Sequence, residues 1–97
     1  MKTDTMTLAE FKRFLADNIG TTLKRNFFAD GQLEQSEKRT LNSANTVGFA
    51  TQGESSLSDM PYGSASEWEF DIYIGAFSAV WTDPEDSSFQ TQYIFQF

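Results

Sequence analysis

Carboxylates are the side chains of this sequence that could do chemistry in numbers. Eight of them follow Thr40, a region that contains no lysine, arginine or histidine: Glu54, Asp59, Glu67, Glu69, Asp71, Asp83, Glu85 and Asp86. A pair of carboxyl groups can act as acid and base on a glycosidic bond, and a cluster can hold calcium. Spread over a surface, carboxylates can instead occupy cationic sites built for phosphates.

The first two kinds of chemistry fit the sequence poorly. Glu67 and Glu69 could form an acid and base pair, but a chain of 97 residues can hardly build the substrate cleft as well as a core. Without histidine or cysteine, a Ser-His-Asp arrangement and a thiolate metal site are impossible. Asp83, Glu85 and Asp86 lack the ligand spacing of a calcium loop. We therefore expect no enzyme, no cofactor and no bound metal.

The distribution of charge favours a surface role. All seven basic residues precede Thr40 and stand beside six acids, so residues 1–39 carry +1 and the remainder carries −8, which gives the net charge of −7. Such a field attracts cationic surfaces and repels nucleic acid and anionic lipid. The basic residues include three doublets, which we expect on exposed helix faces: Lys12-Arg13, Lys24-Arg25 and Lys38-Arg39.

One row of acids has a spacing that resembles nucleic acid. Alternate strand residues Glu67, Glu69 and Asp71 would project from one face about 6.6 to 6.8 Å apart, close to the phosphate spacing of a strand. They could equally be the solvated face of a one-sided sheet, although such faces normally mix both signs. We expect the eight acids to form one outward stripe, anchored by exposed members of the set Tyr62, Tyr73 and Trp81.

The N-terminal elements are predicted from capping and periodicity. Residues 7–10 form a capping box, and an apolar stripe follows through Leu8, Phe11, Leu15 and Ile19, with Gly20 as a stop. We favour a second helix over residues 21–29. If that segment is a strand, Asp30-Gly31 becomes a tight hairpin turn.

The rest of the chain should contain strands. We expect a short surface helix or an ordered loop over 32–45, a strand over 46–51 and an irregular connection over 52–66. Alternation predicts a strand over 67–74, and 77–82 should pair with 89–97. The predicted fold is α+β, with three to four antiparallel strands packed against the N-terminal helix, one or two further short helices, and a single domain over 1–97.

In size, acidity, lack of cysteine and histidine, and aromatic sheet, the chain resembles the small phage-encoded anti-CRISPR proteins. The likeness is to acidic DNA mimics that inhibit type I surveillance complexes, and it matches no motif residue by residue. It implies a non-catalytic inhibitor that enters the target-DNA channel of a Cascade-type complex, contacts basic Cas subunits and prevents DNA binding. Inhibitors of restriction enzymes and of uracil-DNA glycosylase are similar on the same grounds, but the basic N-terminal third differs from many DNA mimics.

Two further expectations concern the setting of the chain. No apolar run is long enough to span a bilayer and the N-terminus lacks a signal-like apolar core, so we expect a cytoplasmic protein of the host cell. The alternative function is a small acidic phage structural or assembly protein, whose charge serves solubility. Indifference of its partner contact to salt would distinguish that packing interface from a charge mimic.

Overall fold

The computed structural model describes residues 2–4, 6–54 and 56–96 of the chain. Within these residues there are one α-helix, one short 3-10 helix and eight strands. Their bounds are β1 Lys2–Asp4, α1 Leu8–Asp17, β2 Thr22–Ala29, β3 Gln32–Ala44, β4 Gly48–Gln52, β5 Leu57–Pro61, η1 Ala65–Glu67, β6 Trp68–Tyr73, β7 Ala76–Thr82 and β8 Phe89–Gln96. The expected sheet of three to four strands with additional helices is therefore wrong.

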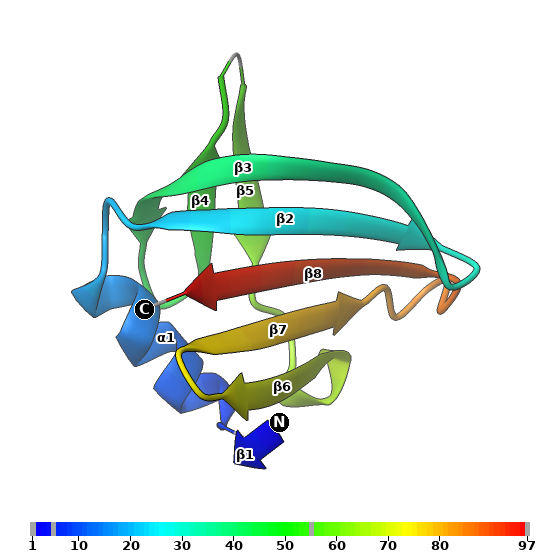
Figure 1. Ribbon diagram of the computed structural model, residues 1–97, viewed down its shortest axis with the longest axis horizontal. Helices are drawn as coiled ribbons and strands as arrows, with labels where there is room; N and C mark the ends of the chain where they lie inside the picture. The colour runs from blue at the N-terminus through cyan, green and yellow to red at the C-terminus, as the bar shows by residue number, and fades with distance from the viewer. Residues whose placement is uncertain (1, 5, 55, 97) are drawn as a thin grey trace.

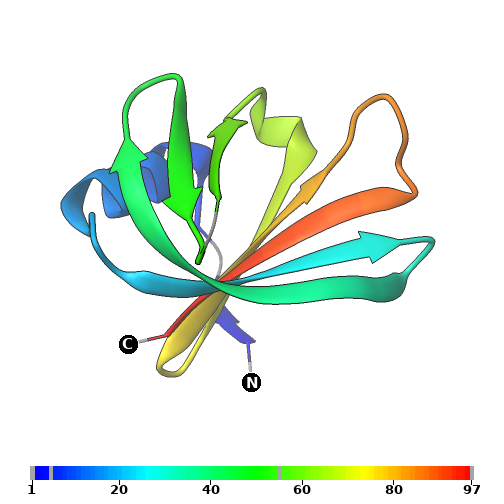
Figure 2. The ribbon, with the colours of Figure 1, turned by 90° about the horizontal axis from the view of Figure 1, so that it is seen from above.

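All eight strands belong to one antiparallel sheet in the order β1-β6-β7-β8-β2-β3-β4-β5. In Figure 1 the strands from β6 to β3 run side by side, and α1 lies at their left-hand ends. Figure 2 shows how strongly the sheet twists and curls. The turn between β2 and β3 and the loop between β7 and β8 lie together at the opposite end from α1 (Figure 1).

The helix forms where the sequence predicted it. The Thr7 hydroxyl accepts a hydrogen bond from the Glu10 amide at 3.2 Å, and the Glu10 carboxylate accepts one from the Thr7 amide at 2.9 Å. These bonds satisfy two amides that the first turn leaves without helical partners. The helix ends at Asp17, and Gly20 then adopts a φ of +97° in the turn that leads to β2.

Aromatic packing fixes the helix on the inner face of the sheet, which we define as the face that contacts α1. The Phe11 ring is fully buried and lies 5.1 to 6.4 Å, between centroids, from six rings of the sheet and its connections: Phe49, Tyr62, Trp68, Phe70, Phe77 and Phe95. Phe14 adds edge contacts to Phe77 and Phe95. Aromatic burial of this extent can hold a small domain together without disulfides.

Three segments differ from their predictions. Residues 21–29 are strand β2 rather than a helix, and residues 32–45 contain the 13-residue strand β3 rather than a helix or loop. The expected irregular connection over 52–66 contains strand β5 and the helix η1. In β2 and β3 the inward positions include charged residues, so the alternation of apolar and polar residues that normally marks a strand is hidden.

Candidate functional site

Carboxylates from two distant segments meet at the end of the sheet opposite α1. The Asp30 amide in the β2–β3 turn donates to the Ser88 carbonyl in the β7–β8 loop at 2.8 Å, and Ala29 is paired with Phe89. We call this end the acidic tip and define it by five carboxylates and two exposed apolar side chains: Asp30, Glu34, Asp83, Glu85, Asp86, Leu33 and Phe89.

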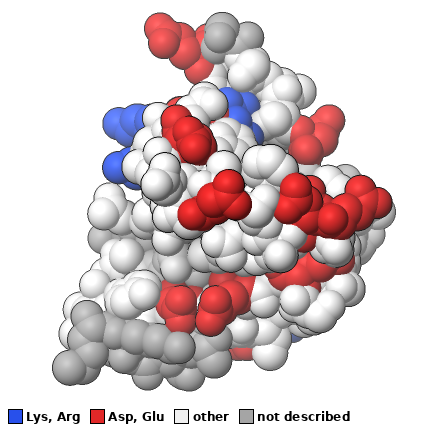
Figure 3. Space-filling view, turned by 90° about the vertical axis from the view of Figure 1, so that its right-hand side faces the viewer, with Lys and Arg blue, Asp and Glu red and all other residues white. Residues whose placement is uncertain are grey.

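The acidic tip carries one sign of charge. Residues 28–36 and 81–90, which form it, contain its five acids and no lysine or arginine. Figure 3 looks onto this end: acidic side chains are spread across the surface, and basic ones are visible mainly in its upper part. The field at this end is therefore negative, which suits a cationic partner.

The loop that presents three of these acids is held by its own side chains. Asp83 accepts a hydrogen bond from the Glu85 amide at 2.9 Å. Asp86 accepts from the Ser88 hydroxyl at 2.6 Å and from its amide at 3.1 Å, and these bonds lower the pKa of the Asp86 carboxyl. The loop is thus ordered by local bonds before any partner arrives, which reduces the entropy lost on binding.

Apolar side chains stand beside the charges. Leu33 is 56 % exposed and Phe89 is 50 % exposed, and both lie at the strand ends that form the acidic tip. Binding surfaces commonly combine an apolar anchor with a charged rim, because burial of the anchor adds affinity while the charges steer the encounter.

The predicted row of three acids is not formed on one face of β6. Glu69 and Asp71 lie on the outer face, because Trp68 and Phe70 occupy the inward positions. Glu67 is the last residue of η1 instead of part of the strand.

The Glu67 carboxylate is committed to local hydrogen bonds. It accepts from the Ser64 amide at 2.7 Å, the Ser64 hydroxyl at 2.9 Å and the Trp81 indole N–H at 3.1 Å. These bonds lower the pKa of Glu67, the Ser64 amide contributing most. Glu67 thus caps a turn and holds Trp81.

The remaining predicted residues lie elsewhere. Glu54 is exposed just after β4, and Asp59 is exposed on β5, the strand that ends the sheet. Of the eight predicted acids, the structure brings Asp83, Glu85 and Asp86 together with two acids that were not predicted.

Of the expected anchors, Tyr62 is buried at 1 % exposure among core rings, Trp81 is half-buried and Tyr73 is partly exposed.

The basic doublets on β2 and β3 are split by the alternation of strand side chains. Lys24 and Lys38 are exposed on the outer face, whereas Arg25 and Arg39 are buried on the inner face. The expectation of exposed helix faces is therefore wrong for these two doublets. It remains correct in part for Lys12-Arg13, which lies on α1 with Arg13 exposed.

The two buried arginines share the Glu37 carboxylate and the Ser58 hydroxyl as acceptors. Arg25 donates to the Glu37 carboxylate through Nε at 2.9 Å and through Nη2, and Arg39 Nη1 lies 3.4 Å from the same oxygen. Arg39 also donates to the Thr51 hydroxyl at 2.6 Å, the Thr51 carbonyl at 2.8 Å and the Ser56 carbonyl at 3.0 Å. These bonds allow a charge to be buried.

The inner cluster makes the surface more negative, because it removes positive charge from it. With two guanidinium groups and one carboxylate, it holds a net positive charge inside the molecule. Burial raises the pKa of the adjacent Tyr93 hydroxyl to about 12, although both arginines oppose the shift. The hydroxyl therefore stays neutral at physiological pH, and two of the seven cations are withdrawn from the exterior.

Sequence reasoning missed Asp30, Glu34, Leu33 and Phe89. The available signal was the dipeptide Asp30-Gly31. If it is interpreted as a hairpin turn, residues 22–29 and 32–44 become neighbouring strands. Glu34 then lies at the bulge between pairs Phe27–Gln35 and Phe28–Leu33. The contact with the β7–β8 loop depends on the order of strands in the sheet, which local patterns do not encode.

Comparisons with models of known protein families, with curated proteins and with solved structures found no match to this chain. In residues 2–4, 6–54 and 56–96 there is no group of three acids placed to hold a metal ion. No helix in this described part of the chain is long and apolar enough to cross a bilayer.

Proposed function

We propose that this chain is a non-catalytic binding protein whose acidic tip occupies a cationic, nucleic-acid-binding groove of another protein. The observation that carries the proposal is the Asp30–Ser88 contact, which joins two acidic segments from opposite halves of the sequence into one surface without a basic residue. The tip then imitates part of a nucleic-acid backbone by charge, and its partner loses access to DNA or RNA.

The physical argument rests on three properties of the tip. Its five carboxylates favour fast, salt-dependent encounter with lysine and arginine clusters. The bonds of Asp83 and Asp86 order the loop in advance. Phe89 and Leu33 offer apolar area that a partner can bury, which supplies affinity that screening by salt does not remove.

A matched pair of variants tests the proposal. Asp30→Asn with Glu85→Gln removes two charges from the tip, and asparagine tolerates the φ of +52° at position 30. Glu54→Gln with Glu69→Gln removes two charges elsewhere at exposed positions. Both double variants have the same net charge, so a difference between them reports the position of the charge.

The target to test first is the one that the resemblance implies, a purified type I surveillance complex with labelled target DNA. The wild-type chain should displace DNA, and the displacement should weaken with added salt. The tip variant should bind about tenfold more weakly, which corresponds to about 1.4 kcal/mol for two charges at a contact, while the control changes little. No displacement by the wild-type chain, or equal displacement by both variants, would contradict the proposal for this target.

The alternative of a structural or assembly protein draws on the free edge of the sheet. Among the residues that the structure describes, strand β5 pairs with β4 alone, and Leu57 at its start is exposed. Yet the same strand carries Asp59 and Pro61, and charged residues and proline on an edge disfavour the addition of another strand. Strand addition at β5 is therefore the weaker candidate.

A further inference from the structure

A second charged surface lies on the outer face of the sheet, away from the acidic tip. Lys24 on β2 and Lys38 on β3 are directly paired across the two strands, and both are exposed. Like charges at paired positions destabilise a sheet. The chain has a net charge of −7 and twice as many acidic as basic residues, so acids were available to pair with these lysines. A lysine facing a lysine in such a chain therefore indicates a binding role.

The neighbours of the two lysines on β2, β3 and β8 are neutral. Along β2 and β3 the flanking outer positions are Thr22, Asn26, Ser36 and Thr40, and the partner of Lys24 on β8 is Ile94. No ion pair of either lysine occurs among the residues that the structure describes. The two ammonium charges are thus not neutralised within this surface.

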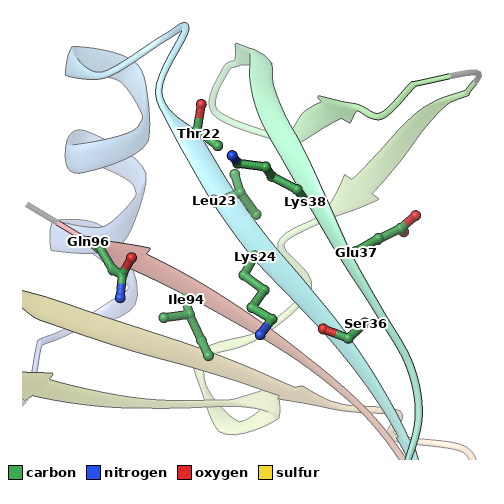
Figure 4. Close-up of a pocket in the computed structure, with 8 residues that line it drawn as sticks. All are labelled: Thr22, Leu23, Lys24, Ser36, Glu37, Lys38, Ile94 and Gln96. Carbon is green, nitrogen blue, oxygen red and sulfur yellow. The ribbon is translucent and has the colours of Figure 1, made fainter.

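The surface is hollowed where the lysines stand. A groove of about 490 Å³ is lined by Thr22, Lys24, Lys38, Ser36, Ile94 and Gln96, together with Leu23 and Glu37. Figure 4 shows the Lys24 and Lys38 ammonium groups directed toward opposite ends of this groove. The Glu37 side chain belongs to the inner cluster with Arg25, so its charge is already paired.

We infer that this groove binds a phosphate-bearing small ligand, whose oxyanion lies between Lys24 and Lys38. The Thr22 hydroxyl and the Gln96 amide on its wall can add hydrogen bonds to phosphate oxygens. Lysine binds phosphate as a mobile point charge, so both ammonium groups can turn toward one anion. Binding would relieve the repulsion between the two lysines.

One carboxylate limits the affinity. Glu54 lines an adjoining hollow together with Lys38 and Thr22, without forming an ion pair to Lys38. Its charge opposes an incoming phosphate. Replacing Glu54 should therefore raise the affinity for phosphate, whereas replacing either lysine should lower it.

The experiment is a titration of the whole chain with inorganic pyrophosphate, in which two-dimensional NMR records the amide chemical shifts at each step. Saturable shifts should map to β2, β3 and β8 around the groove. Lys24→Gln and Lys38→Gln should each weaken binding about three- to fivefold, the size expected for one exposed ion pair. Glu54→Gln should tighten binding by a similar factor, and the spectra themselves report that each variant is folded.

Arg13→Gln is the control, because it removes one exposed positive charge on α1, away from the groove. It should leave the affinity for pyrophosphate unchanged. Shifts that do not saturate, shifts that map elsewhere, or equal weakening by Arg13→Gln would overturn the inference. Since none of these residues belongs to the acidic tip, the result is independent of the proposed function.

Discussion

At the scale of single residues, a Lys-Arg doublet on a strand provides two side chains with different roles. Strand geometry sends consecutive side chains to opposite faces, so Lys24 and Lys38 reach solvent while Arg25 and Arg39 enter the interior. Arginine suits the inner position because its planar fork can donate several bonds at once. Here those bonds reach Glu37, Thr51 and Ser56.

Replacing Arg39 should reveal how much the inner cluster stabilises the fold. Arg39→Met removes the bonds to the Thr51 and Ser56 carbonyls and leaves the Thr51 carbonyl buried without that donor. We expect the free energy of unfolding to fall by about 3 to 5 kcal/mol, measured by urea denaturation. Lys38→Met, at the exposed neighbour, should change it by less than about 0.5 kcal/mol. Similar losses for both variants would show that the cluster is not the cause.

The two buried tyrosines should behave oppositely when their hydroxyls are removed. The Tyr62 hydroxyl is buried without a hydrogen-bond partner in the described structure, so Tyr62→Phe should raise the free energy of unfolding by about 1 kcal/mol. The Tyr93 hydroxyl, in contrast, interacts with the buried Arg25, so Tyr93→Phe should lower the free energy of unfolding by about 1 kcal/mol. Denaturation of both variants at neutral pH checks the signs, and a loss of stability in Tyr62→Phe would contradict the account.

Tyr93 should also make stability depend on alkaline pH. Its pKa is about 12 in the folded chain and about 10 when unfolded, so the folded state keeps the proton that the unfolded state releases in between. The stabilisation is therefore complete below pH 10 and is lost as the pH rises from about 10 to 12. In denaturation experiments, Tyr93→Phe should reduce the slope of unfolding free energy against pH in this range. An unchanged slope would show that other groups cause it.

At the scale of elements, the β2–β3 hairpin depends on a two-residue turn. Asp30 and Gly31 have φ angles of +52° and +77°, the left-handed pair that a type I′ turn requires. Gly31→Ala should cost about 1 kcal/mol in unfolding free energy, because the added methyl group strains this conformation. Gly31→Asn should cost less, since asparagine tolerates left-handed φ. Equal costs would point to a cause other than backbone strain.

The elements show what sequence patterns could and could not predict. The capping box of Thr7 and Glu10 and the alternation in β6 gave correct elements, because their buried positions are apolar. Strand β2 was mistaken for a helix because Leu23 and Phe27 also fit helical spacing and the inward residue between them is Arg25. Strand β3 is hidden in the same way by Glu37 and Arg39, because its inward positions hold a half-buried and a buried ion rather than apolar side chains.

At the scale of the whole molecule, charge is sorted among three places. The inner face holds two guanidinium groups and one carboxylate, the outer face holds the Lys24–Lys38 pair, and the acidic tip holds five carboxylates. The predicted excess of negative charge in the second half of the sequence is real. The eight acids do not form a single stripe. Three of them lie in the β7–β8 loop, where Asp30 and Glu34 of the first half join them, and the other five lie elsewhere.

Hydrogen-deuterium exchange on the chain bound to the purified type I surveillance complex tests the central claim most directly. The account predicts that binding slows exchange in residues 28–36 and 81–90, which form the acidic tip, and that added salt weakens the complex and reduces this protection. Exchange in β4, β5 and the β6 strand should stay as in the free chain. Protection confined to those strands, with the tip exchanging freely in the complex, would contradict the account.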